Sequence, residues 1–480
     1  MVEGDGLENR YSEQSESRVR IPPSPPAKNS ILVISTLASF LTPFMGSSTN
    51  IALPSIGREF SINAVVLGWI ATSYILAAAM LLVPLGRIAD IYGRKKVFTI
   101  GIFVYTVASL FCALSSSAVA LIAFRILLGA GGAMIFGTSV AILTSAFPLG
   151  ERGKALGINV AATYLGLSLG PILGGFFTQH LGWRSLFLFN IPICLIIIVL
   201  IFWRLKGEWA EAKGEKFDWA GSFIYGLALV AVMYGLSLLP NLAGAGLIFI
   251  GFIGIIAFSV RENRTESPIL NVHLLRHNRV FGFSNLAALI NYSATQASGF
   301  LLSLYLQYLK GLPPQSAGLI LIAQPVMMTI FSPLAGRLSD KVEPRLVAST
   351  GMALTSASLF FFIFLNENSG LGFIVGCLII LGLGFALFSS PNTNAVMSSV
   401  EKKFYGVASA TLGTMRLVGQ MTSMGIALML FALYMGRVKI TPEYYGVFLK
   451  SSKTAFIIFA VLCVGGVFAS LARGRNQNLK

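Results

Sequence analysis

The chain alternates between long apolar stretches and short polar connections over nearly its whole length. The stretches approach the roughly 20 apolar residues that a helix needs to cross a bilayer, and few of them contain a charge. This pattern predicts membrane-spanning helices rather than the helices of a water-soluble domain. We expect fourteen spans, at residues 31–53, 64–85, 97–115, 119–146, 155–177, 185–203, 219–239, 243–260, 280–306, 316–335, 346–365, 371–394, 406–434 and 454–472.

A basic hairpin between the second and third stretches recurs between the tenth and eleventh. Both copies carry glycine, arginine and aspartate at matching positions, which indicates two homologous halves. Glycine permits a tight turn. The charged side chains predict a clasp that ties the halves together on the cytoplasmic side and opens during transport. The residues of this gate are Gly86, Arg87, Asp90, Gly93, Arg94 and Lys95 in the first copy, and Gly336, Arg337, Asp340 and Arg345 in the second.

The positions of the two hairpins also predict a linker between the halves. A plain duplication of six spans would place the second hairpin after the eighth span, whereas it follows the tenth. Two extra spans therefore lie between two six-helix bundles. We expect an all-α integral membrane protein with a disordered cytoplasmic tail (1–29), an N-terminal bundle (30–205), a linker with two spans (206–279), a C-terminal bundle (280–472) and a second cytoplasmic tail (473–480).

Composition agrees with a cell-membrane location. Of the 480 residues, 55% are hydrophobic and only 11% are charged, against about 25% in soluble proteins. The formal net charge of +16 does not indicate a nucleic-acid partner, because most Lys and Arg fall on one side of the predicted spans. This asymmetry places the hairpins and both termini in the cytoplasm and favours contact with anionic lipid.

Two arginines, Arg125 and Arg416, are predicted deep within spans. An arginine at this depth costs about 2.5–3.5 kcal/mol on insertion scales, so it usually faces a cavity and has a function. All nineteen acidic residues fall in tails, loops or span edges, and so no carboxylate is available to pair with either arginine. A static hydrogen-bond anchor is the alternative for Arg125, and for Arg416 a packing anchor and a cavity charge are equally open.

Other polar positions within the spans are candidates for binding or packing. Gly166, Gly170 and Gly174 recur every four residues and form a smooth face against which another helix can lie. Amide side chains at cavity depth can contact a substrate, or can join helices by hydrogen bonds. The amide positions assigned to the substrate cavity are Asn50, Asn159, Asn291, Gln296, Gln324 and Asn394.

Several classes of site are not supported by the sequence. The four cysteines are separated and lie in apolar spans, which predicts neither disulfides nor a zinc site. No catalytic triad, metal cluster or nucleotide-binding loop is recognisable. We therefore expect no enzyme, cofactor, metal or ATP, and no obligate protein partner.

These motifs resemble those of the major facilitator superfamily. The hairpin resembles its signature, Arg125 with Gly129 looks like its fourth-span motif, and residues 166–175 resemble its antiporter motif. Similarity to the fourteen-span drug:proton antiporter branch rests on Trp183-Arg184 with residues 187–192, on residues 305–307 with Gly311, and on residues 406–409 with 416–419. The antiporter motif comprises Gly166, Gly170, Pro171, Gly174 and Gly175.

The resemblance implies two pseudo-symmetric bundles, a substrate site between them and export in exchange for protons. Arg125 and Arg416 would then be the coupling residues, and Arg125 would link occupancy of the site to helix motion. One position departs from the branch pattern, because Met45 stands where this branch commonly carries an aspartate. A deep carboxylate is the usual proton carrier, so the departure bears on proton coupling and on selection of cationic substrates.

The sequence therefore predicts a secondary transporter that exports small amphiphilic compounds by alternating access, with H⁺ as the driving ion. One alternative is an uncoupled or voltage-driven exporter of organic anions or lipid-like metabolites, which would suit an interior with two arginines and no acid. Another is a membrane sensor on the same scaffold that does not transport.

Overall fold

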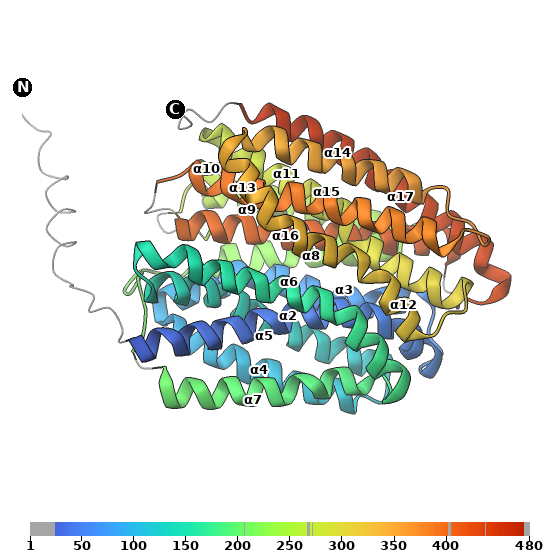
Figure 1. Ribbon diagram of the computed structural model, residues 1–480, viewed down its shortest axis with the longest axis horizontal. Helices are drawn as coiled ribbons and strands as arrows, with labels where there is room; N and C mark the ends of the chain where they lie inside the picture. The colour runs from blue at the N-terminus through green and yellow to red at the C-terminus, as the bar shows by residue number, and fades with distance from the viewer. Residues whose placement is uncertain are drawn as a thin grey trace, which may run out of the picture.

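A computed structural model describes residues 25–205, 207–265, 269–270, 272–401, 405–436 and 438–474. The described residues form helices joined by short connections and contain no β-strand. Figure 1 shows two layers of roughly parallel helices, with the first half of the chain in blue to green and the second half in yellow to red. The fold is therefore an all-α arrangement of two helical halves.

The N-terminal half consists of six helices, and the linker contains two. The six are α2 (Pro25–Glu59), α3 (Ala64–Tyr92), α4 (Arg94–Leu114), α5 (Ala118–Ala146), α6 (Leu149–His180) and α7 (Arg184–Arg204). The linker helices are α8 (Trp219–Leu238) and α9 (Leu242–Glu262).

The C-terminal half follows the short helix α10 (Val272–His277). Two of its long helices end in a π-helical turn, and one is divided near Ile322. Its elements are α11 (Arg279–Leu304) with η1 (Tyr305–Leu309), α12 (Pro314–Leu321) and α13 (Ala323–Lys341), α14 (Pro344–Phe362), α15 (Leu371–Ser398), α16 (Tyr405–Leu430) with η3 (Phe431–Met435), and α17 (Tyr445–Ala472) preceded by η4 (Pro442–Tyr444).

Thirteen helical segments of the described chain are long and apolar enough to cross a membrane. The predicted ninth span is α11, a helix of 26 residues that is not among the thirteen. Its sequence is rich in serine, asparagine and threonine, and most of these side chains are buried against other helices. These polar side chains make α11 less apolar than the thirteen helices, which is why it is not among them. The count of fourteen spans remains a prediction.

Several helices extend beyond the apolar stretches that predicted them. Helix α2 begins at Pro25, so the last residues of the predicted tail are helical, while residues 1–24 lie outside the described part of the chain. Proline is well suited to a first helical turn, because no intrahelical bond needs its missing N–H. At the other end, Arg473 was assigned to a tail but is only 2% exposed. Residues 475–480 are not described.

The two halves repeat one packing pattern. In the N-terminal half α2 packs on α6, α3 on α5, α4 on α5, and α4 on α7. The corresponding contacts in the C-terminal half are α11 on α16, α13 on α15, α14 on α15, and α14 on α17. Contacts between the halves are also symmetrical. Helix α3 packs on α16, and the corresponding helices α12–α13 and α6 pack on each other.

Close approach in these bundles depends on glycine where two helix backbones touch. On α14, a Cβ at Gly351 would lie 2.5 Å from Phe388 N and 2.6 Å from Gly384 O of α15. Gly376, also on α15, has open space where its Cβ would be. Helices in lipid associate largely through such close packing, so the two positions should respond differently to the same substitution.

We predict that Gly351→Ala lowers the thermal stability of the purified protein, whereas Gly376→Ala leaves it unchanged or raises it slightly. The added methyl at position 351 has no space, and overpacking costs about 1–3 kcal/mol. At position 376 only the helix propensity of alanine acts. Thermal unfolding of both variants in one detergent tests this, and equal midpoints would contradict the assigned contact.

Candidate functional site

The first hairpin joins α3 to α4 through the single residue Gly93. Its φ is +121°, a conformation that L side chains rarely adopt. A Cβ there would also lie 2.4 Å from the Glu208 carboxyl carbon. Position 93 therefore requires glycine for two reasons, its backbone conformation and the close approach of a later segment. We call the end of the bundles that carries this hairpin the hairpin end, and the other the distal end.

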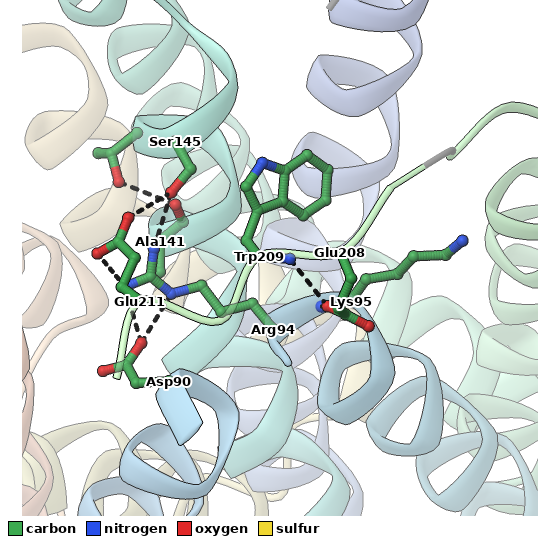
Figure 2. Close-up of polar contacts among 9 residues, drawn as sticks. Asp90, Arg94, Lys95, Ala141, Ser145, Glu208, Trp209 and Glu211 are labelled. Carbon is green, nitrogen blue, oxygen red and sulfur yellow. Dashed lines mark hydrogen bonds and ion pairs between the residues drawn. The ribbon is translucent and has the colours of Figure 1, made fainter. Parts of the chain in front are cut away.

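Arg94 is the centre of the polar network at this hairpin (Figure 2). Its Nε donates to Asp90 Oδ1 at 2.7 Å, and its Nη1 donates to Ser145 Oγ on α5 at 2.7 Å. Its Nη2 donates to Glu211 Oε2 at 2.9 Å. Ser145 Oγ also donates to Glu211 Oε1 at 3.3 Å. One guanidinium thus joins its own hairpin, α5 and a segment that follows α7.

That segment, residues 207–215, runs across the hairpin, and we call it the strap. Glu208 accepts from the backbone N–H groups of Lys95 at 2.8 Å and of Lys96 at 3.2 Å, so its carboxylate caps the N-terminus of α4. Glu215 pairs with Arg87. The bonds described at this hairpin therefore join the N-terminal half to the start of the linker.

The second hairpin has a smaller network. Arg345 Nε donates to Glu343 Oε2 at 2.6 Å within the hairpin itself. Ser339 Oγ donates to the Gly336 carbonyl at 2.7 Å, while Arg337 is exposed. The backbone of Asp340 lies on α13, and its side chain lies outside the described part of the structure. The gate role of both hairpins remains a prediction.

Hydrogen bonds join the two halves near the distal end. Ser303 Oγ donates to the Asn50 carbonyl at 2.6 Å, and Gln307 Nε2 donates to the Ile51 carbonyl at 2.9 Å. Tyr308 OH donates to the Pro54 carbonyl at 3.4 Å. Gln307 and Tyr308 belong to the π-turn η1. We had not assigned these contacts, although Gln307 belongs to one of the motifs that resemble the antiporter branch.

The glycines of the antiporter motif close two different seams. A Cβ at Gly166 would lie 2.5 Å from Phe40 O, at Gly170 1.8 Å from Ser47 Oγ, and at Gly174 2.9 Å from Ser48 Cα, all on α2. The seam between α2 and α6 lies within the N-terminal half.

Gly175 faces the other half of the molecule. A Cβ there would lie 2.6 Å from Pro314 O, and a Cβ at Gly318 of α12 would lie 2.0 Å from Pro171 O. Gln315 N also donates to Gln179 Oε1 at 3.2 Å beside this crossing. This second seam, between α6 and α12, holds the distal end closed in the structure.

Arg125 is 1% exposed on α5. Its Nη1 donates to Thr49 Oγ1 of α2 at 3.0 Å, and its guanidinium lies 5.6 Å from the ring centroid of Tyr74 on α3. Gly129 and Gly132 make room for that tyrosine, because a Cβ at either would lie 2.8 Å or less from its atoms. The Nε of Arg125 is buried without a hydrogen-bond partner among the described residues. A hydroxyl and an aromatic face thus surround this cation.

Met45 lies directly beside the group that holds Arg125. Thr49 Oγ1 donates to the Met45 carbonyl at 2.6 Å and lies 3.3 Å from Met45 Sδ. An aspartate at position 45 would therefore share the Thr49 hydroxyl with Arg125. The absence of a carboxylate at this position leaves the arginine with neutral neighbours.

Arg416 on α16 has a similar environment in the other half. Its Nη2 donates to Thr393 Oγ1 of α15 at 2.7 Å, and its guanidinium lies 5.8 Å from the ring centroid of Tyr292 on α11. Tyr292 packs edge-on against Phe385. The buried Nε of Arg416 has no partner among the described residues. Each half therefore holds one arginine with a threonine and a tyrosine.

Three of the amide candidates lie at contacts between helices of one half. Asn159 bonds Ser35 O at 3.1 Å and Ser39 Oγ at 2.7 Å on α2, and Asn394 bonds Ser339 Oγ at 3.1 Å, so both join helices within one half. The carbonyl of Gln324 faces the α13–α15 crossing.

Asn50 and Gln296 lie where the halves meet. Asn50 faces Gly299 of α11, and Gln296 is on the same helical face as Tyr292 and Gly299. Asn291 is fully buried on α11, with neither amide atom paired among the described residues.

Arg473 is a further buried arginine, and sequence reasoning missed it. Its Nη1 donates to Asn392 Oδ1 at 3.1 Å and to Ser284 Oγ at 3.3 Å, which joins the end of α17 to α15 and α11. The apolar stretch ends just before residue 473, so the sequence resembles the start of a tail. Only the positions of α11 and α15 show that the side chain turns inward.

Comparison with known proteins agrees with this architecture. The family pattern of the Major Facilitator Superfamily matches residues 35–290 and again residues 284–478. The riboflavin transporter RibZ of Clostridioides difficile is 31% identical over 389 residues, which cover 80% of this chain and 84% of that protein. The cephamycin export protein CmcT of Amycolatopsis lactamdurans is 32% identical over 415 residues, with 83% and 84% covered. The multidrug resistance protein Stp of Mycobacterium tuberculosis is 28% identical, with 81% and 73% covered.

Solved transporter structures share the fold at low sequence identity. A peptide transporter POT in complex with sulfate superposes with a TM-score of 0.67 at 15% identity and covers 91% of this chain and 94% of its own. A bacterial homologue of the human lysosomal transporter Spinster, inward-facing and unoccupied, gives 0.64 at 16% identity, with 94% and 98% covered. The family pattern matches both halves, the fold has many helices long enough to span the cell membrane, and the relatives include proteins named for multidrug resistance and antibiotic export. This chain therefore belongs to the Major Facilitator Superfamily and to its drug-efflux branch.

Proposed function

We propose that the protein exports small amphiphilic compounds by alternating access, in exchange for protons. The observation that carries the proposal is the seam between α6 and α12, where Gly175 and Pro171 of the antiporter motif meet the backbone at Pro314 and Gly318 and bring the two halves into backbone contact at the distal end. The closest contacts of this seam join glycine to backbone carbonyls, so the seam is tight when closed, and the side chains of Gln179 and His180 bond Gln315 beside it. Relatives named as export proteins for cephamycin and tetracenomycin C support the direction of transport.

The environment of the two arginines favours a second candidate, the export of organic anions or neutral amphiphiles. Arg125 and Arg416 each contact a threonine and a tyrosine, and Met45 replaces the aspartate that would balance Arg125. An unbalanced positive charge in a low-dielectric interior attracts an anion and repels a cation. An inside-negative potential supplies about 2.3 kcal/mol per charge per 100 mV to expel an anion.

We predict that inverted vesicles containing the protein accumulate a fluorescein-type anion faster than a rhodamine-type cation with the same ring system. Arg125→Ala and Arg416→Gln should each lower anion transport by about tenfold or more, which corresponds to about 1.4 kcal/mol of lost stabilisation. Arg276→Gln, at an exposed position on α10 outside the assigned sites, is the matched control for removal of a positive charge. Transport confined to the cation would refute the anion candidate.

Ionophores separate proton exchange from voltage-driven export. Nigericin, which collapses the pH gradient, should stop a proton antiporter and leave a voltage-driven anion exporter active. Valinomycin with potassium, which collapses the voltage, should do the reverse. Dye accumulation in the same vesicles is the measurement, and activity that resists both treatments would contradict each of the two mechanisms.

We predict that Met45→Asp changes the protein from an anion exporter into a proton-coupled exporter of cations. The new carboxylate would lie beside Thr49 and within reach of Arg125, so it would neutralise that cation and introduce a titratable group. Anion transport should fall, and transport of the cationic dye should become sensitive to nigericin. Met45→Asn, which has the same shape without the charge, is the control. Equal behaviour of the two variants would show that the charge at position 45 does not set coupling.

A further inference from the structure

The linker helices are bonded to the N-terminal half by the strap. Besides the Arg94–Glu211 pair and the Glu208 cap on α4, two backbone bonds fix its path. Arg94 N donates to Trp209 O at 2.8 Å, and Ala212 N donates to Asp90 O at 3.0 Å. Lys95 Nζ also donates to the Leu205 carbonyl at 2.5 Å where the strap begins. These bonds hold the chain that leads into α8 against the ends of α3, α4 and α5.

Helix α8 continues this attachment along α3. Tyr225 OH donates to the Ala79 carbonyl at 3.1 Å, and both groups are buried. At the next residue of each helix, a Cβ at Gly226 would lie 3.2 Å from Met80 Cε. A buried hydrogen bond to a helix carbonyl fixes the position of α8 on α3, because breaking it would leave a polar group without a partner in an apolar setting.

Toward the C-terminal half the contact is of a different kind. Helix α8 meets α16 where Met233 and Leu236 lie over Gly425, and a Cβ at Gly425 would be 2.9 Å from both Met233 Sδ and Leu236 Cδ1. Methionine and leucine on a glycine make an apolar contact with no directional bond. Methionine also adapts its shape easily, so this contact can be maintained at more than one relative position.

The two linker helices are in turn held together. Arg261 at the end of α9 donates from Nη2 to Asp218 Oδ1 at 2.7 Å and from Nε to Oδ2 at 2.9 Å, a bidentate pair at the start of α8. Hydrogen bonding from Arg261 also lowers the pKa of Asp218, which keeps this pair charged. Glycines at 235, 244 and 251 allow the two helices to lie close together. The pair α8–α9 can therefore move as one unit.

We propose that the linker pair α8–α9 moves with the N-terminal half during transport, that α8 slides on α16 at Gly425, and that Glu208 and Glu211 are the positioning residues that fix this assignment. The inference rests on the alternating-access function proposed above. It gives Glu208 and Glu211 a role, because they join the linker to the N-terminal half, whereas the contact of α8 with α16 at Gly425 is apolar.

Distances between introduced spin labels test the assignment without a substrate. The labels sit at exposed positions on α9 (Val260), α4 (Ile100) and α14 (Leu346), and the four native cysteines are buried. Gly318→Leu serves to force the distal seam apart, since even a Cβ would lie 2.0 Å from Pro171 O. Gly175→Leu is the alternative if that variant is unstable.

We expect Val260→Cys with Ile100→Cys to give the same distance in both conformations, and Val260→Cys with Leu346→Cys to give a shifted one. A shift of the first distance, or a constant second distance, would overturn the assignment. A third pair, Leu181→Cys with Leu371→Cys, reports the distal end. If the labels of that pair do not move apart, the proposed opening of the distal seam is wrong. That result would contradict the proposed function and not the assignment of the linker.

Removal of the strap charges gives an independent test. Glu208→Gln with Glu211→Gln should broaden the Val260–Ile100 distance distribution of the otherwise unmodified protein. It should also lower kcat for the anionic dye while KM and the ratio of anion to cation transport stay unchanged. Glu443→Gln removes an exposed carboxylate at the distal end and should do neither. An unchanged distribution in the strap variant would show that these residues do not hold the linker.

Discussion

The structure depends on how helices are joined in a solvent that offers neither hydrogen bonds nor a hydrophobic driving force. Lipid tails are as apolar as leucine, so helices associate through close backbone approach and through polar side chains that find partners. Both devices are visible at the seam between α2 and α6. Gly166, Gly170 and Gly174 admit the backbone and side chains of α2, and Asn159 bonds Ser35 and Ser39 on the same helix.

Close contact at glycine and hydrogen bonding between polar side chains are used differently within the halves and between them. Within each half, glycine contacts occur together with hydrogen bonds between side chains, as at Asn394 and Ser339. Between the halves at the distal end, backbone carbonyls of α2 accept from Ser303 and Gln307, the side chains of Gln179 and His180 bond Gln315, and the closest contacts are at Gly175 and Gly318. The α8–α16 contact at Gly425 is apolar. Helix contacts that differ in this way within and between the halves suit a protein whose halves rock against each other.

Charge is arranged by the same constraint. At the hairpin end, where water and lipid heads solvate ions, Arg94 pairs with two carboxylates and a hydroxyl. In the interior, Arg125 and Arg416 contact hydroxyls and aromatic faces. The asymmetry is chemically informative, because a buried cation without an acid leaves its balance to a ligand or to the membrane potential. Met45 belongs to this arrangement, since it contacts the hydroxyl that Arg125 uses.

By itself, the sequence determined the helical membrane fold and its two halves, while the bounds of the linker between them remain a prediction. These follow from the length and apolarity of each stretch and from a repeated hairpin, both of which are local properties of the chain. It also identified Arg125, Arg416 and the glycine face of α6. It missed the inward turn of Arg473, the strap contacts of Glu208 and Glu211, and the distal bonds of Gln307. Those partners are separated by between 81 and 256 positions. Only the tertiary structure decided them, because a polar side chain at the end of an apolar stretch can face water, lipid heads or another helix, and the sequence pattern is the same in each case.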